Sequence, residues 1–360
     1  MAKWGTSLAA LLAAALPLAA CGGAEQATDA VGDAADAVGS AVSGGSRLDT
    51  VLSRGQLICG VDGGIPGFSF VDESGEYSGL DVDVCKAVAA ALFDDPDAVE
   101  YRNLDSTERF EALKGGEVDM LSRNTTWTTS RDTSVGMEFA PTTFYDGQGM
   151  MVRGDSGVTT LEDMDGLAIC VETGTTTELN LTDQFRQRGI SFEPVVFQDA
   201  DAGYAAYEEG RCDGFTSDKS QLIARRSTLS EPEAHVLLDV TMSKEPLGPV
   251  TINNDSAWFD TVKWITFGLI QAEEFGLTAD TVEDAISAED PNILRFVGAE
   301  GTLGEDMGLP NDFMLRAVKH VGNYGEIFER NLGADSQFEL DRGQNALWTD
   351  GGLMYAPPFR

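Results

Sequence analysis

Short apolar runs alternate with amphipathic segments along the chain from residue 48 onward. The runs "QLICGV" and "VDML" have the length and composition of buried strands, and the segments "LDVDVCKAVAAALF" and "ERFEALKGG" carry apolar residues at helical spacing. Asp105 and Glu108 mark the start of the second of these helices, and Gly115 and Gly116 mark its end. Apolar strands that alternate with helices predict a parallel sheet covered by helices.

The same alternation begins again in the middle of the chain and predicts a second lobe over residues 151–242. The first lobe is expected to comprise residues 47–150 and to resume at 243–360, where further helices and a C-terminal extension follow. The extended segments "GQGMMVR" and "VTMSKEPLGPVTIN" connect the two lobes, and both are rich in Gly or Pro. The predicted fold is therefore α/β, with two lobes that are each a sheet flanked by helices, joined by a two-strand hinge.

The first residues predict export. Residues 1–20 contain one basic residue, Lys3, and an apolar stretch too short to span a membrane, which is typical of a signal peptide. The sequence Leu-Ala-Ala-Cys that ends at Cys21 resembles a bacterial lipobox, in which the cysteine becomes lipid-modified. Residues 21–46 are rich in Gly, Ala, Ser and Asp and are expected to form a flexible tether to the lipid. The alternative is ordinary cleavage near Ala20, which leaves Cys21 free.

Composition and charge narrow the function classes. The 360 residues suit two domains. The 60 acidic residues outnumber the 24 basic ones, and the formal net charge of −36 argues against binding to nucleic acid, whose phosphates would be repelled. The sequence has no metal-ligand spacing and no phosphate-binding loop, so neither a metal nor a cofactor is expected.

Four cysteines follow Cys21, and an exported protein meets an oxidising compartment in which even numbers of cysteines suggest disulfides. Four cysteines allow three pairings. Sequence proximity favours Cys59–Cys85 and Cys170–Cys212, and the alternative is four buried thiols.

A run of hydroxyl side chains, "SRNTTWTTSRD", directly follows the predicted strand "EVDML". Ligands in open α/β sheets bind at the carboxyl ends of strands, which is where this run lies. Arg131 closes the run, so it is a candidate ligand-binding residue in a strongly acidic chain.

Several motifs, in this order, resemble solute-binding proteins of bacterial amino-acid ABC transporters, family 3: "GFSF", "GLDVDVCKAVAAAL", "ERFEALKGGEVD", "RNTTWTTSRD", "YDGQGMMV", "ETGTTTELNL", "GRCDGFTSD" and "SKEPLGPV". The C-terminal "GNYGEIFERNLG" and "LWTDGGLMYAPPFR" resemble the branch that binds many L-amino acids. The resemblance implies a two-lobed periplasmic-binding-protein fold (type II) that closes on free L-amino acids. It also implies a monomer in the periplasm or at the cell surface that delivers its ligand to an ABC permease and catalyses no reaction.

The resemblance also implies a site on the first lobe. A carboxylate is best matched by a planar, bidentate cation, and the resemblance assigns that role to Arg131. Asn124 and Thr126 would add polar contacts from the same loop. Phe68 and Arg123 are expected at the wall of the side-chain pocket, although Phe68 equally suits the core.

The second lobe supplies the other half of the predicted site. Gly174 ends a strand, and Thr175 with Glu178 predicts a capping box at the start of a helix, whose free N–H groups suit an anion. The resemblance puts Thr176 on the ligand carboxylate and Asp218 on the ammonium group. The alternative for Asp218 is a helix start, and Asp213 is expected to cap a strand and face solvent.

Two other functions remain open from the sequence. An enzyme of the same fold, dehydratase-like or glycan-cleaving, would need a poised acid or base in the cleft. The chain has only two histidines, His235 and His320, and neither neighbours a nucleophile motif, so both are expected to be structural. A sensor that reports ligand occupancy to a receptor would use the same binding chemistry as a transport protein.

Overall fold

The computed structural model describes residues 45–360, of which Ser46–Arg360 form one compact unit. The predicted signal segment 1–20, Cys21 and nearly all of the predicted tether lie outside the described residues. Within the described part of the chain, no helix is long and apolar enough to cross a membrane.

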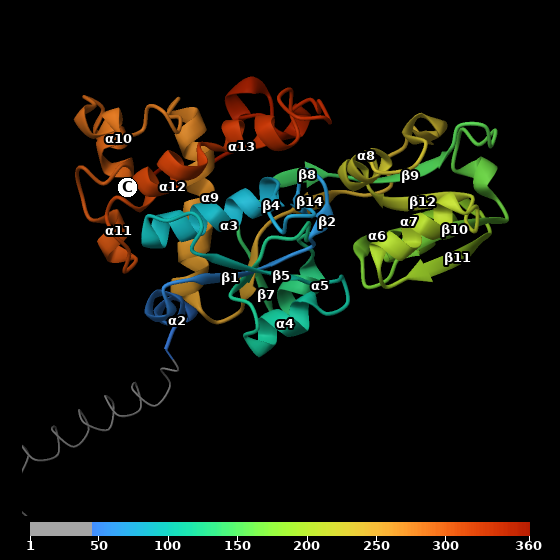
Figure 1. Ribbon diagram of the computed structural model, residues 1–360, viewed down its shortest axis with the longest axis horizontal. Helices are drawn as coiled ribbons and strands as arrows, with labels where there is room; N and C mark the ends of the chain where they lie inside the picture. The colour runs from blue at the N-terminus through green and yellow to red at the C-terminus, as the bar shows by residue number, and fades with distance from the viewer. Residues whose placement is uncertain (1–44) are drawn as a thin grey trace, which may run out of the picture. The chain divides into compact units, whose positions relative to one another are not determined.

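The first lobe is built on a five-stranded sheet in the order β5-β1-β6-β15-β7 (Figure 1). Its strands are β1 (Leu57–Val61), β5 (Val99–Asn103), β6 (Met120–Leu121), β7 (Met137–Phe139) and β15 (Val250–Ile252). The strand β1 pairs in parallel with β5 and β6, as predicted, but β15 runs antiparallel to β6 and β7. The sheet is therefore mixed, because β15 enters it from the second lobe.

Helices cover both faces of this sheet. Its helices are α2 (Arg47–Arg54), α3 (Leu80–Phe93), α4 (Arg109–Gly115), α5 (Thr129–Thr133), α9 (Ser256–Glu274), α10 (Pro291–Phe296), α11 (Leu303–Asp306), α12 (Phe313–Val321) and α13 (Tyr324–Asn331). One large apolar core joins β1 to α3, α9, α12 and α13, and a smaller core lies under α4. The helices α3 and α4 lie on opposite sides of the sheet (Figure 1). The C-terminal helices thus complete the first lobe.

The second lobe has a five-stranded sheet in the order β11-β10-β12-β9-β13. Its strands are β9 (Gln148–Arg153), β10 (Leu167–Glu172), β11 (Phe192–Phe197), β12 (Gly214–Asp218) and β13 (His235–Leu237), and its helices are α6 (Thr176–Arg188), α7 (Ala200–Glu208) and α8 (Lys219–Arg226). Alternate residues of β9 enter different cores: Met150 packs on the side of α6, and Met151 on the side of α7 and α8.

Two antiparallel strands, β8 (Phe144–Asp146) and β14 (Glu245–Leu247), form the connection between the lobes. The first crossing lies just before Gln148, slightly ahead of the predicted boundary at residue 151, because all of β9 pairs in the second sheet. The strand β9 runs antiparallel to β12, so this sheet is also mixed and the prediction of a wholly parallel sheet is wrong here too.

The segment "GIPGFSFVDESGEYSG" forms a small three-stranded sheet. Its strands are β2 (Gly64–Ile65), β3 (Ser69–Val71) and β4 (Tyr77–Ser78). These strands are too short for a clear alternating pattern, and tight turns rather than apolar periodicity set their pairing.

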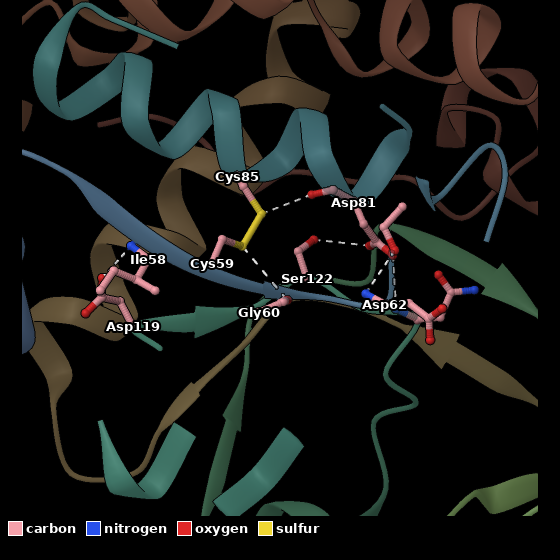
Figure 2. The surroundings of a disulfide bond; sticks show 10 residues. Ile58, Cys59, Gly60, Asp62, Asp81, Cys85, Asp119 and Ser122 are labelled. Carbon is pink, nitrogen blue, oxygen red and sulfur yellow. Dashed lines mark hydrogen bonds between the residues drawn. A yellow bond between two sulfur atoms is a disulfide. The ribbon is translucent and has the colours of Figure 1, made fainter. Parts of the chain in front are cut away.

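Both predicted disulfides are confirmed. Cys59 on β1 is bonded to Cys85 on α3, and Cys170 on β10 is bonded to Cys212 just before β12. Figure 2 shows the first bridge one helical turn from Asp81, whose carboxylate accepts a hydrogen bond from Ser122. The bridge therefore fastens α3 to the central strand close to the loop that follows β6.

Replacing Cys170 and Cys212 together by alanine should lower the free energy of unfolding by about 3–4 kcal/mol, because the bridge spans 42 residues. Urea unfolding followed by circular dichroism measures the change. The wild-type protein with reductant is the control and should show a further loss from the second bridge. A loss below about 1 kcal/mol in the double variant would contradict the entropic account.

Candidate functional site

A polar pocket lies between the two lobes. The first lobe contributes Ser106, Arg109, Arg123, Asn124, Thr126 and Arg131, and the second contributes Glu172, Thr175, Thr176, Thr177, Ser217, Asp218 and Gln221. The structure thus brings together seven of the nine residues predicted to bind ligand: Arg123, Asn124, Thr126, Arg131, Thr175, Thr176 and Asp218.

The loop after β6 holds Asn124 in an unusual conformation. Its φ of 41° lies in the left-handed region that L-residues seldom adopt. Its backbone N–H donates to Asp81 Oδ2 at 3.0 Å. Ser122 Oγ donates to Asp81 Oδ1 at 3.1 Å (Figure 2). Burial raises the pKa of Asp81 to about 7. The buried carboxyl group of Asp81 therefore fixes the conformation of the loop. A strained backbone conformation such as that of Asn124 is typical of binding sites.

Arg131 lies on the short helix α5, whose N-cap Thr128 accepts a hydrogen bond from the Arg131 backbone N–H. Arg131 Nη1 donates to the carbonyl of Thr126 at 2.8 Å, and the guanidinium lies over the ring of Phe110 at 5.3 Å. Burial lowers the pKa of Arg131 to about 10, and the negative charges of Glu245 and Asp218 oppose that shift. The side chain is thus fixed at one end and still charged at neutral pH.

The second lobe presents the first turn of α6. Thr175 is its N-cap and accepts from the N–H of Glu178 at 3.1 Å, as predicted. The side chain of Glu178 accepts instead from the N–H of Gly174 at 3.0 Å, so the capping box is shifted by one residue. Thr176 Oγ1 donates to Glu245 Oε2 at 2.9 Å and lies 3.3 Å from Thr126 Oγ1, which joins the two lobes.

Asp218 ends β12 and is the N-cap residue of α8, but its side chain makes no capping hydrogen bond. Its Oδ1 atom is buried without a partner among the described residues. Burial raises the pKa of Asp218 well above its usual value, and the nearby carboxylates Asp146 and Glu245 raise it further. Asp218 therefore stands at the helix start, as the alternative expected, but capping does not use its carboxylate.

Three residues of the pocket carry buried polar atoms that have no hydrogen-bond partner within residues 45–360. These atoms are Oδ1 of Asp218, Nε of Arg109 and both side-chain polar atoms of Asn124. Buried polar atoms are nearly always paired in folded proteins, and an unpaired one costs about 1–3 kcal/mol. The pocket thus offers an unmatched anion on one lobe and an unmatched cation and amide on the other.

Arg109 is a pocket residue that the sequence analysis missed. It is only 2% exposed, and burial together with the positive charges of Arg123 and Arg131 holds its pKa well below its usual value. The signal was present, because Arg109 shares the buried face of α4 with Ala112 and Leu113 at helical spacing. A charged residue on an apolar helical face is a candidate for a site.

Two predicted residues lie elsewhere. Phe68 is 1% exposed and packs edge to face against Phe144 in the core of the first lobe, so of its two expected positions the core is the one found and the pocket wall is not. An apolar ring is better buried in that core than beside a polar pocket. Gly174 lies outside the pocket lining, and its N–H is already used by Glu178.

The residues considered for other functions lie away from the pocket. His235 is buried and hydrogen-bonded to Tyr207, and His320 is paired with Asp94. Asp213 is exposed and accepts from the N–H of Ala168, which caps β10 as predicted. Among the described residues, no group of three or more His, Cys, Asp or Glu side chains is arranged to hold a metal.

Comparisons with known proteins agree with this arrangement. The model for bacterial extracellular solute-binding proteins, family 3, matches residues 57–266. The chain is 49% identical to the general L-amino acid-binding periplasmic protein AapJ of Rhizobium johnstonii, over 92% of this chain and 98% of that protein. It is also 49% identical to the glutamate/glutamine/aspartate/asparagine-binding protein BztA of Rhodobacter capsulatus, over 88% of this chain and 94% of that protein.

A solved structure extends the comparison to three dimensions. It is a periplasmic binding protein of an ABC transporter from Brucella ovis with glutathione bound, with 46% identity and a TM-score of 0.86. The match covers 88% of this chain and all of that chain. The fold, the interlobe pocket and these matches agree, and the chain belongs to family 3 of the bacterial extracellular solute-binding proteins.

Proposed function

We propose that the protein binds free L-amino acids between its lobes and delivers them, in a closed form, to the permease of an ABC importer. The observation that carries this proposal is that the pocket holds groups of opposite charge with unpaired atoms, Oδ1 of Asp218 from one lobe and Nε of Arg109 from the other, and that Arg131 of the same lobe as Arg109 also lines it. A zwitterion supplies one partner of each sign and leaves no net charge. Leaving either buried charge unpaired would cost several kcal/mol.

Each end of the zwitterion has its own partner. Arg131 binds the α-carboxylate with its two-pronged guanidinium, and Asn124 and Thr126 add polar contacts from the same loop. Thr175 and Thr176 at the start of α6 offer the free N–H groups of a helix N-terminus to the same carboxylate, and the Thr176 hydroxyl exchanges its hydrogen bond to Glu245 for one to the ligand. Asp218 receives the ammonium group. The two lobes thus hold opposite ends of one small ligand.

Closure follows from this division of the site. Thr126 meets Thr176 at 3.3 Å, Arg123 meets Glu172 at 3.7 Å, and Gln198 Nε2 donates to Asp105 at 2.9 Å. Each of these contacts joins one lobe to the other, so they exist only when the lobes are together. An amino acid shifts the population toward this form because only this form lets both lobes bind it at once.

Arg109 is proposed to select the ligand side chain. It is a buried guanidinium whose Nε has no partner, and Arg131 already serves the α-carboxylate. A side-chain carboxylate or amide oxygen would satisfy Arg109, which agrees with the ligands in the name of the Rhodobacter relative. Other amino acids could bind through their α-groups alone, which fits a protein of broad specificity.

Replacing Arg109 by methionine should have two opposite effects. The free protein should gain about 1–4 kcal/mol of stability, because a buried, poorly paired cation is replaced by an apolar side chain of similar length. Glutamate and glutamine should bind at least tenfold more weakly, while alanine binds as before. Thermal unfolding and calorimetric titration measure the two effects. Arg102→Met on the surface is the control, and a variant that binds glutamate normally would contradict the assignment.

We further propose that residues 1–20 are a removed signal peptide, that Cys21 is lipidated, and that residues 21–46 tether a monomeric binding unit to a membrane. The lipobox-like sequence and the absence of aromatic residues in the tether support this. Mass spectrometry of the native protein should show a lipid on Cys21, and an unmodified Cys21 would contradict the anchor.

Calorimetric titration of the ligand-stripped protein with the twenty L-amino acids tests the proposed function. Saturable binding of several amino acids, with the ligand recovered unchanged, is expected. The absence of binding across the whole set, or conversion of a ligand to a product, would overturn the proposal.

A further inference from the structure

A second and larger cavity lies beside the amino-acid pocket, also between the lobes. Its free volume is about 650 Å³. The first lobe lines it with Asp62, Gly63, Gly64, Phe70, Val71, Asn103, Leu104, Asp105 and Arg123, and the second with Glu172, Gln198, Asp199, Ala200, Asp201, Arg225 and Thr228. Arg123 and Glu172 line both cavities, so these two side chains form the partition between them.

The two side chains of the partition belong to different lobes, and the contact between them is weak. Arg123 is held in the first lobe, where it pairs with Asp62 at 2.7 Å and donates to the carbonyl of Leu104 at 2.8 Å. Its contact with Glu172, at the end of β10 in the second lobe, is longer at 3.7 Å. A small opening of the lobes would therefore separate Arg123 from Glu172 and leave Arg123 in place.

The inner pocket cannot contain a long ligand by itself. Its free volume is about 20 Å³, little more than the 10–15 Å³ or so that one water molecule needs. The pocket must widen even for a small amino acid, and a ligand side chain that continues beyond it meets the partition and then the outer cavity. The outer cavity is thus large enough for the part of a ligand side chain that extends beyond the inner pocket.

Both α-groups of the ligand are used in the inner pocket, which limits how a longer ligand can be built. This step rests on the proposed function, in which Arg131 binds the α-carboxylate and Asp218 the α-ammonium. A peptide joined through either α-group loses one of these charges. A ligand extended through its side chain keeps both.

We propose that the outer cavity is a second subsite, which takes the distal part of amino acids extended through their side chains. The ligand class is peptides joined through a side-chain carboxyl group, such as γ-glutamyl peptides. The glutamyl α-groups occupy the inner pocket, and the attached residue lies in the outer cavity.

The lining of the outer cavity suits such a group. Arg225 is 8% exposed; its Nη1 pairs with Asp201, and its Nε has no partner among the described residues. The guanidinium thus keeps donor capacity for a carbonyl or carboxylate oxygen of the attached residue. Asn103 and Gln198 supply side-chain amides, and Phe70 and Leu104 supply apolar surface. Five acidic residues and two arginines line the cavity, so an additional negative charge on the attached residue is disfavoured.

Two isomers test the proposal directly. The full-length, ligand-stripped protein is titrated with γ-glutamylalanine, with its isomer α-glutamylalanine and with L-glutamate. The proposal predicts that the γ isomer binds at least tenfold more tightly than the α isomer, and that γ-glutamylglutamate binds more weakly than γ-glutamylalanine. Equal affinities of the γ and α isomers, or tighter binding of γ-glutamylglutamate, would overturn it.

Substitutions that fill the outer cavity should weaken the binding of γ-glutamyl peptides but not the binding of free glutamate. Ala200→Phe narrows the cavity from α7, and Thr228→Trp narrows it from an exposed position that tolerates a large side chain. Each should weaken γ-glutamylalanine at least tenfold and change glutamate less than threefold, whereas Leu179→Phe on the surface should change neither. Unchanged binding of γ-glutamylalanine in both cavity variants would overturn the subsite. Failure of glutamate to bind the wild type would instead overturn the proposed function.

Discussion

Replacing Arg131 by alanine should reduce the affinity for every amino acid by more than 100-fold, with little change in the stability of the free protein. Removing one partner of a buried charge pair costs about 3–5 kcal/mol, because the other charge is left unpaired. Arg131 is 7% exposed and lines the pocket with Thr126, Thr176 and Asp218. The other two arginines of the pocket do not replace it, because Arg123 is paired with Asp62 and Arg109 is assigned to the ligand side chain. Calorimetric titration of the purified variant measures the loss.

Two further variants make this result specific. Arg131→Lys keeps the charge but not the planar fork, so it should bind about tenfold more weakly than wild type and more tightly than Arg131→Ala. Arg186→Ala is the matched control, because Arg186 lies on the surface of the second lobe in a pair with Asp183. If Arg131→Ala binds within threefold of wild type, Arg131 does not bind the ligand carboxylate.

Replacing Asp218 by asparagine should weaken amino-acid binding by about 3 kcal/mol, or about 100-fold, because the ligand ammonium loses its partner on the second lobe. The same change should stabilise the free protein at neutral pH. Asp218 is 6% exposed, and its charge is opposed by burial and by the nearby Asp146 and Glu245. A loss of affinity together with a gain in stability would show that Asp218 serves ligand binding at a cost to the stability of the fold.

The pH dependence of this stabilisation has a definite sign. The pKa of Asp218 is 3.8 in an unperturbed chain and is raised well above that value by burial in the folded protein. Below pH 3.8 both states hold the proton, and the Asp218→Asn change has no electrostatic effect. As pH rises from 3.8 to the raised pKa, the unfolded state has released the proton and the folded state still holds it, so the wild type loses stability relative to the variant until the raised pKa is passed.

Ligand affinity should depend on pH through the same carboxylates. A ligand ammonium group favours the ionised form of Asp218. At pH values at which Asp218 of the free protein is still protonated, amino-acid binding should therefore release that proton. Burial also raises the pKa of Asp146 to about 6. Affinity should therefore fall as pH is lowered from 7 to 5 and fall less in Asp218→Asn. The surface variant Asp183→Asn is the control, and a flat pH profile for the wild type would contradict the linkage.

The sequence predicted the lobes and the disulfides because their signals are local, whereas the resemblance supplied most of the predicted pocket residues. Apolar runs, helix caps and a hydroxyl-rich loop at the end of a strand all occur within short segments. The site residues Arg131 and Asp218 were found by resemblance and are brought into one pocket by the structure. Which strands run antiparallel is not a local property, because β9 and β15 take their direction from the chain's passage between lobes.

The missed and misplaced residues have a common cause. Phe68 was expected at the pocket wall or in the core, and Arg109 was assigned no role. In the structure Phe68 packs on Phe144 in the core, and Arg109 lies on the buried face of α4 with an Nε atom that has no partner among the described residues. Neither burial nor a missing partner is a local property of the sequence, so only the folded pocket shows them.

The supporting residues could not be predicted for the same reason. Asp81 on α3 holds Asn124 in its left-handed conformation, although the two residues are 43 positions apart in the chain. Glu245 on the connecting strand β14 accepts hydrogen bonds from Thr176 and Asn180 of α6, both at 2.9 Å. These long-range contacts fix the binding groups in place, and they follow from the fold as a whole.

The central claim is that both charges of a zwitterion are bound at once, one by each lobe. The most direct measurement is calorimetric titration of the ligand-stripped protein with L-glutamate, its N-acetyl derivative and its α-methyl ester. The account predicts that glutamate binds with submillimolar affinity and that each blocked analogue, which lacks one of the two charges, binds at least 100-fold more weakly. Binding of either analogue within a few-fold of glutamate would contradict the two-ended clamp of Arg131 and Asp218.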